Sequence, residues 1–275
     1  MSRYIDLIKR AQQGECILID GATGTEVDRR GVPQLDNAWN GGGALSHPKI
    51  VKQIHKDYID SGAEIIISNT FATTKHALRD ANQEHNFEVL NRRGVELAIQ
   101  AREELSNNSI LVAGGISYWT WTGNKPSLEE LRLSVSEQAQ IMRDAGANLI
   151  MLEMMIDIEQ MITTIEAAKT SGLPVWVGLT CEPNKSNEMG LRDGDRLETD
   201  NLSSSSEGLL PVQVQYEIPP ATRTLLLSSS ALASTASSTP RLFKASKLCS
   251  WLASLRACLV VAKVLLMIIS APDSI

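Results

Sequence analysis

Short apolar runs recur five times in the first 180 residues, and this repetition restricts the folds that the chain can adopt. The runs cover residues 17–20, 64–68, 110–114, 148–153 and 175–180. Most of them are continuously apolar, which is typical of parallel strands that are covered on both faces. Such strands are joined by helices in right-handed crossovers. The pattern therefore predicts an α/β fold, either an open doubly wound sheet or a closed (β/α)8 barrel.

Helix signals fill the gaps between these runs. Residues 47–61 place apolar side chains on one face, and Gly62 follows as a terminating glycine. Ser127 and Glu130 have the spacing of a capping box, and Asp157 can cap the next helix. His55 lies inside the first of these helices and is expected at the surface.

Polar residues gather where the predicted strands end. In both architectures, ligands bind at the carboxyl ends of the strands. The candidate positions there are Asp20, Ser68, Asn69, Thr70, Gly114, Gly115, Glu153 and Thr180. A functional site is therefore expected at this edge of the sheet.

Asp20 ends the first run and is followed by a loop of small residues that begins Gly21-Ala-Thr-Gly-Thr25. The loop is not a GxGxxG fingerprint, because its spacing differs and no acid follows about twenty residues later. Small residues let a ligand approach the backbone, and Asp20 can accept hydrogen bonds from an ammonium group. Taken alone, the pair Asp20-Gly21 favours a simpler interpretation, an Asx-turn or the N-cap of the next helix.

Glu153 also ends an apolar run, and a buried carboxylate needs a partner to offset its desolvation. A salt bridge to a neighbouring strand is one explanation. The other is a ligand, since acids on the first and fourth strands of a barrel would both point into its mouth and favour a cation such as an amino acid. Asn69 and Thr70 could hold a carboxylate beside Phe71, or could simply satisfy the loop backbone.

Charge and composition exclude several classes of function. The formal net charge is −6 and the pI is about 5.3, so no basic surface for nucleic acid is expected. Cys16, Cys181, Cys249 and Cys258 have neither zinc-finger nor CxxC spacing. The first residues lack the apolar core of a signal peptide, which predicts a cytoplasmic protein.

The composition changes sharply near residue 198. All 18 glycines lie at or before Gly208, and residues 201–275 contain 15 serines. We therefore divide the chain into residues 1–198, with about five β/α units, and an atypical tail, residues 199–275. A shift of reading frame near residues 196–204 would explain the change, and a divergent natural segment is the competing interpretation. If the tail is a natural segment, the fifth predicted strand is expected to have an unpaired edge.

The apolar stretch of residues 257–270 in this tail is shorter than the ~20 residues that span a bilayer, so a membrane partner is not expected. A membrane-tethered protein that uses this stretch as its anchor is the third hypothesis.

Several segments together resemble the homocysteine S-methyltransferase family, in the family's order and near its spacing. They lie within roughly residues 5–198 and are residues 18–26, 47–48, 58–63, 68–71, 111–116, 145–148, 153 and 191–194. The resemblance implies a (β/α)8 barrel that transfers a methyl group from a small donor to the thiol of homocysteine, giving methionine. The family's donors include betaine, S-methylmethionine and S-adenosylmethionine.

The resemblance also implies zinc as a cofactor. Family members hold the metal with three cysteines, one usually preceded by Asn after the sixth strand and two in a Gly-Gly-Cys-Cys motif at the eighth. Zinc keeps the homocysteine sulfur as a nucleophilic thiolate. This chain contains neither an Asn-Cys pair nor a Gly-Gly-Cys-Cys motif, so no metal ligand is predicted in it.

By resemblance, Asp20 and Glu153 match the acids that engage the homocysteine amino group, and the residues after the second strand match the pocket wall. The predicted substrate-binding residues are Asp20, Gly21, Thr23, Gly24, Asn69, Thr70, Phe71 and Glu153. The predicted function is homocysteine methylation. The alternative is a non-catalytic barrel remnant, or an amino-acid-binding protein without metal.

Overall fold

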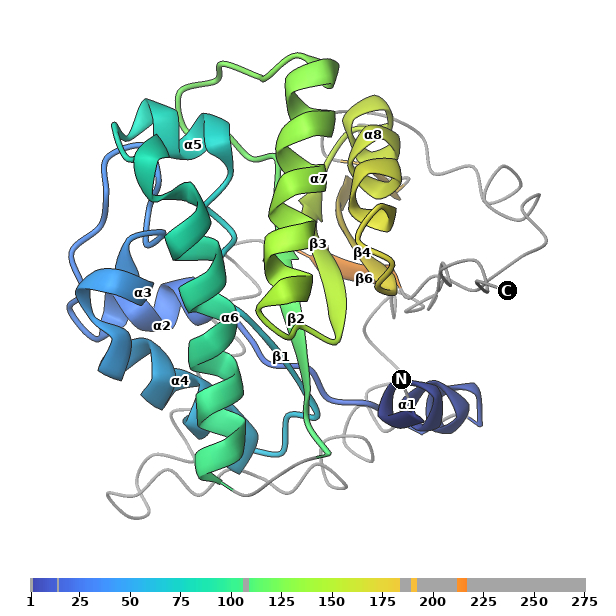
Figure 1. Ribbon diagram of the computed structural model, residues 1–275. Helices are drawn as coiled ribbons and strands as arrows, with labels where there is room; N and C mark the ends of the chain where they lie inside the picture. The colour runs from blue at the N-terminus through green and yellow to red at the C-terminus, as the bar shows by residue number, and fades with distance from the viewer. Residues whose placement is uncertain (1, 14, 106–108, 184–188, 192–211, 217–275) are drawn as a thin grey trace.

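A parallel sheet covered by helices forms the centre of the molecule (Figure 1). The computed structural model describes residues 2–13, 15–105, 109–183, 189–191 and 212–216. The parallel strands lie in sequence order as β1 (Ile65–Ile67), β2 (Leu111–Ile116), β3 (Leu149–Met155) and β4 (Val175–Pro183). All four lie where apolar runs predict them, which confirms the α/β class.

The helices follow the strands in the order expected of β/α units. They are α1 (Ser2–Gln12), α2 (Thr23–Arg29), α3 (Gly43–Ser46), α4 (Pro48–Asp60), α5 (Lys75–Asp80), η1 (Glu84–Asn86), α6 (Phe87–Glu104), α7 (Leu128–Asp144) and α8 (Ile158–Lys169). Ser127 and Glu130 form the predicted capping box of α7, and Asp157 caps α8 by accepting from the Gln160 backbone nitrogen at 2.8 Å. The prediction for His55 is wrong, because this residue of α4 is fully buried.

The two faces of the sheet belong to different cores. Alternate strand residues such as Ile66, Val112 and Ile150 pack toward the covering helices. The intervening residues form a second cluster with Tyr4 and Leu7 of α1, and comprise Ile65, Ile67, Leu111, Ala113, Leu149, Met151 and Trp176. Helix α1 thus covers the inner face near the amino ends of the strands. The carboxyl ends remain available for a site.

The first predicted strand is reduced to a single parallel bridge between Ile19 and Ile65. The Asp20 nitrogen still donates to the Ile65 carbonyl at 2.9 Å, and the Glu64 nitrogen donates to the Leu18 carbonyl at 2.8 Å. The segment therefore lies beside β1, as a first barrel strand should, and it brings Asp20 to the carboxyl end of β1.

The fifth predicted strand is β4, and the prediction that its edge is unpaired is wrong. Strand β6 (Val212–Tyr216) pairs with β4 in parallel, and β5 (Met189–Leu191) pairs with it in the antiparallel direction. The apolar stretch of residues 257–270 lies outside the described residues, as do Cys249 and Cys258. Within the described part, no helix has the length and apolar character needed to cross a membrane.

Candidate functional site

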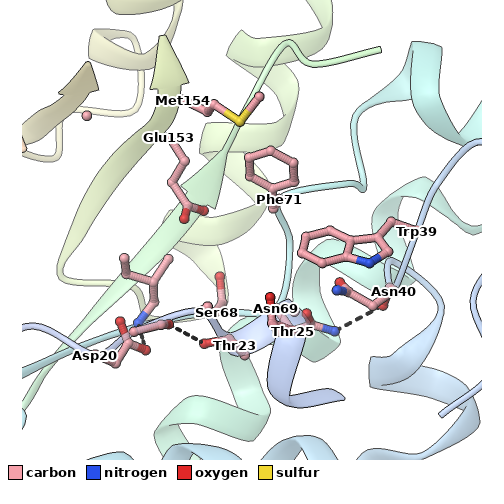
Figure 2. Close-up of a pocket in the computed structure, with 15 residues that line it drawn as sticks. Asp20, Thr23, Thr25, Trp39, Asn40, Ser68, Asn69, Phe71, Glu153 and Met154 are labelled. Carbon is pink, nitrogen blue, oxygen red and sulfur yellow. Dashed lines mark hydrogen bonds between the residues drawn. The ribbon is translucent and has the colours of Figure 1, made fainter. Parts of the chain in front are cut away.

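A cavity of about 240 Å³ opens at the carboxyl ends of the strands (Figure 2). Seven of the eight predicted site residues line it, namely Asp20, Gly21, Thr23, Gly24, Asn69, Phe71 and Glu153. They come from three segments that are far apart in the sequence. These are the loop that follows Ile19, the loop that follows β1, and the end of β3. The topology of parallel strands brings them together.

Asp20 is held rigidly at one side of this cavity. Its side chain is buried, and Oδ2 accepts a hydrogen bond from the Ile67 backbone nitrogen at 2.8 Å. The other oxygen, Oδ1, is buried without a hydrogen-bond partner among the residues that the structure describes. Ala22 occupies the N-cap of α2 and no side chain caps this helix, so the N-cap interpretation of Asp20 is wrong. This oxygen of Asp20 therefore has capacity for a further hydrogen bond.

Glu153 reaches the cavity because β3 is irregular at its end. Leu152 pairs with Val177, whereas Met155 pairs with Leu179. The chain thus advances by three residues on β3 and by two on β4, which leaves one extra residue on β3. The extra residue, Met154, has a left-handed φ of 60°. A bulge of this kind re-aims side chains. Glu153 and Met154 therefore both line the cavity, although neighbouring strand residues normally point to opposite faces.

The backbone around this bulge fits closely against its neighbours. The Tyr118 hydroxyl accepts hydrogen bonds from the backbone nitrogens of Ile156 at 2.6 Å and Asp157 at 3.0 Å. A Cβ on Gly115 of β2 would collide with Oε2 of Glu153. Gly115 is therefore needed for the carboxylate to occupy its place.

The two carboxyl groups are difficult to ionise in the free protein. Burial raises the pKa of Glu153 to about 8. Burial also raises the pKa of Asp20 well above its usual range; the Ile67 N–H lowers it, and the nearby Glu153 raises it further. Among the described residues neither acid has a cationic partner, which leaves the salt-bridge interpretation of Glu153 without support. A bound cation would stabilise both ionised carboxylates.

The polar groups that follow β1 are already hydrogen-bonded within the protein. Asn69 Nδ2 donates to the Asn40 carbonyl at 3.2 Å (Figure 2). The Thr70 hydroxyl donates to the Gly115 carbonyl at 2.7 Å and lies 2.7 Å from the Ser68 hydroxyl. Thr70 is fully buried and does not line the cavity. This loop therefore supports the cavity wall, and its amide and hydroxyl groups have little capacity left for a ligand.

Further residues complete the lining, and among them the sequence pointed only to Ser68 and to Ala22 and Thr25 of the small-residue loop. The further members are Ala22, Thr25, Trp39, Asn40, Ile67, Ser68, Met154 and Gly178. Trp39 meets Phe71 edge to face, with ring centroids 6.1 Å apart, and Phe71 meets Trp121 likewise at 6.2 Å. Trp121 thus extends an aromatic row that begins in the cavity wall.

The described residues do not fit the zinc site that the family resemblance implies. No group of three His, Cys, Asp or Glu side chains among them could hold a metal ion. Cys16 is exposed, and Cys181 lies in β4, where its backbone pairs with both β5 and β6. No chemical step through zinc can be derived from these residues.

Comparison with known proteins identifies the family. The sequence model of "Homocysteine S-methyltransferase" matches residues 17–216. Homocysteine S-methyltransferase 1 of Arabidopsis thaliana is 25% identical over 225 residues, which cover 73% of this chain and 68% of that protein. A selenocysteine methyltransferase of Astragalus bisulcatus is 30% identical over 172 residues, covering 52% of this chain and 51% of that protein.

A solved structure supports the same fold. The metallated form of the homocysteine methyltransferase MmuM of Escherichia coli superimposes with a TM-score of 0.61 at 21% identity, covering 81% of this chain and 91% of the other. The family match spans well over half of the sequence and extends to the end of β6. The chain belongs to the homocysteine S-methyltransferase family.

Proposed function

We propose that this chain binds homocysteine in the cavity, with the ammonium group held between Asp20 and Glu153, as the acceptor in a methyl transfer that gives methionine. One observation carries the proposal. The buried carboxyl group of Asp20 and the partly buried carboxyl group of Glu153 line one small cavity, and a buried oxygen of Asp20 has no hydrogen-bond partner among the described residues. Buried carboxylates without a counter-charge are costly, so an α-ammonium group is the complementary ligand.

The aromatic row supports a methyl donor with a positive charge. Trp39 and Phe71 line the cavity beside the acidic pair. Aromatic faces attract cations, and quaternary ammonium groups are recognised in this way. In the transfer, the acceptor sulfur forms a bond to the methyl carbon as the bond to the donor's cationic nitrogen or sulfur breaks. The donor leaves neutral, and the thiol proton passes to solvent.

A second candidate function is amino-acid binding without methyl transfer. It is favoured by one specific observation, the absence from this sequence of the Asn-Cys and Gly-Gly-Cys-Cys motifs. Both functions use the same acidic pair. They differ in whether the bound thiol is activated.

Calorimetric titration with L-homocysteine tests the shared step. We expect binding by the wild-type protein and a loss of at least tenfold in affinity in Asp20→Asn and in Glu153→Gln, because each variant removes a charge partner of the ammonium group. Glu64→Gln is the matched control, since this acid lies just before β1 and pairs with Arg10 at 2.5 Å, outside the cavity lining. A folded wild-type protein that binds no homocysteine would refute both functions.

A methionine-forming assay then separates the two candidates. Wild-type protein is incubated with homocysteine and either betaine or S-methylmethionine, with and without added zinc. Methionine formation that disappears in Asp20→Asn supports the transferase. Tight binding without methionine formation under every condition supports the binding protein.

A further inference from the structure

The cavity contains a buried hydrogen-bond donor that no group in the described part of the chain satisfies. Asn40 is 2% exposed, and its side-chain nitrogen Nδ2 is buried without a hydrogen-bond partner. The residue lines the same cavity as the acidic pair. A buried donor left unpaired costs about 1–3 kcal/mol, so its position calls for an acceptor from outside the protein.

Close packing fixes this amide in place. A Cβ on Gly24 would collide with Asn40 Nδ2 and would lie 2.7 Å from Cη2 of Trp39. The Asn40 carbonyl accepts the hydrogen bond from Asn69, which anchors the backbone at the same point. The small residue at position 24 thus provides the room in which the carboxamide lies.

The charges around the cavity indicate which acceptor is missing. Its lining contains two acids and no lysine or arginine among the described residues. A ligand with an ammonium group and a carboxylate would have its cation satisfied by Asp20 and Glu153, whereas its carboxylate would need a neutral donor. Asn69 already uses one amide hydrogen on the Asn40 carbonyl, and the Ser68 hydroxyl lies 2.7 Å from the Thr70 hydroxyl, which itself donates to the Gly115 carbonyl.

We infer that the side-chain amide of Asn40 donates a hydrogen bond to the carboxylate of a zwitterionic ligand in this cavity. The inference rests on the proposed function and adds the residue that recognises the anionic end of the ligand. Asn40 lies beside Trp39, away from Asp20 in Figure 2. The carboxylate that Asn40 binds belongs either to the acceptor amino acid or to a methyl donor such as betaine.

Paired ligands test this inference and separate the two sources. L-homocysteine is compared with 3-aminopropane-1-thiol, and betaine with choline; the second member of each pair lacks the carboxylate. In Asn40→Asp we expect a loss of 10- to 100-fold in affinity for the carboxylate-bearing member of one pair, because an amide donor is replaced by a like charge. The carboxylate-free member is a cation and should bind at least as tightly as it binds the wild-type protein, because the added carboxylate attracts it. The pair that responds identifies the source.

Two further variants keep the test independent of folding. Asn40→Leu removes the donor at similar volume, and Gly24→Ala displaces the amide while leaving its chemistry intact. Both should reproduce the loss for the same ligand. Asn37→Asp is the control, because it makes the same change in the same loop outside the cavity lining. Circular dichroism and thermal melting verify that each variant is folded.

The outcomes distinguish failure of this inference from failure of the proposed function. If wild-type protein binds homocysteine but no Asn40 variant separates the members of either pair, the inference is wrong and the proposed function stands. Equal losses for both members would show a structural role for Asn40 and would also overturn the inference. If the folded wild-type protein binds none of the four ligands, both proposals fall.

Discussion

Oε2 of Glu153 occupies the space beside the α-carbon of Gly115 that a Cβ would fill. The same Cβ would lie 2.9 Å from Cγ2 of Ile67, so Gly115→Ala cannot be accommodated by moving one flexible side chain. We expect this variant to displace the carboxylate and to lower homocysteine affinity at least tenfold. Overpacking of this kind also destabilises a fold by about 1–3 kcal/mol. Calorimetry and urea unfolding measure the two effects.

Gly114→Ala is the matched control on the same strand. Its Cβ would lie 2.5 Å from the sulfur of Met142 in α7, on the helix-facing side of the sheet. This variant should lose stability while keeping its affinity for the ligand. Equal loss of affinity in both variants would show that the Gly115 effect comes from general distortion of β2.

A second prediction concerns stability and pH. Burial raises the pKa of Glu153 from 4.5 to about 8, so between these values the native protein holds a proton that the unfolded chain has lost. This contribution is therefore stabilising at low pH and is lost as pH rises toward 8. Glu153→Gln should stabilise the protein more near pH 8 than near pH 5. Urea unfolding measures both conditions, and an equal change in stability at the two pH values would contradict the raised pKa.

Ligand binding should release a proton from the same group. Near pH 7 the free protein keeps Glu153 largely protonated, because its pKa is about 8. An ammonium ligand favours the ionised carboxylate, so its binding expels that proton and becomes tighter as pH rises toward 8. Calorimetry in buffers of different ionisation enthalpy counts the protons. Release should disappear in Glu153→Gln, and unchanged release there would assign the proton to another group.

The apolar runs place Asp20 and Glu153 at the carboxyl ends of strands, and both line the cavity. Their role in binding the homocysteine amino group comes from the family resemblance and stays a prediction. The sequence did not reveal Trp39 and Met154. Each has a left-handed backbone, with φ of 43° and 60° respectively, and neither is a glycine that would signal such a conformation. These conformations are set by tertiary packing, which overrides the local preference of the residue.

Thr70 shows a related limit of sequence analysis. It stands among residues that line the cavity, yet its hydroxyl turns to the Gly115 carbonyl on the neighbouring strand. The loop after β1 has no regular alternation from which this direction could be read. The sequence predicts His55 at the surface of its helix, whereas α4 is fully buried at this position.

His55 provides a fourth prediction. Both ring nitrogens are buried without partners, and burial lowers the pKa to about 4 from 6.5. Between these values the unfolded chain binds a proton that the native protein excludes, so stability falls as pH decreases below 6.5. From pH 7 to pH 5 the expected loss is on the order of 2 kcal/mol. His55→Leu should remove this part of the acid sensitivity, as measured by urea unfolding.

The last prediction concerns Tyr118, whose hydroxyl holds the chain directly after the bulge that presents Glu153. Tyr118→Phe removes the acceptor of the Ile156 and Asp157 N–H groups, and with it the donor to the Asp157 carbonyl at 3.3 Å. Leaving such groups unpaired costs about 1–3 kcal/mol. Because the strained Met154 lies two residues earlier, we also expect the bulge to relax and homocysteine affinity to fall severalfold. Urea unfolding and calorimetry measure the two effects.

Tyr4→Phe is the control for this variant, since it makes the same change at the opposite end of the sheet. Its hydroxyl accepts from Trp176 Nε1 at 3.0 Å, within the core beside α1. It should lower stability with no change in affinity, because no residue of the cavity depends on that bond. If Tyr118→Phe likewise lost only stability, the bulge would be held by the pairing of β3 with β4, and the hydroxyl would have no part in placing Glu153.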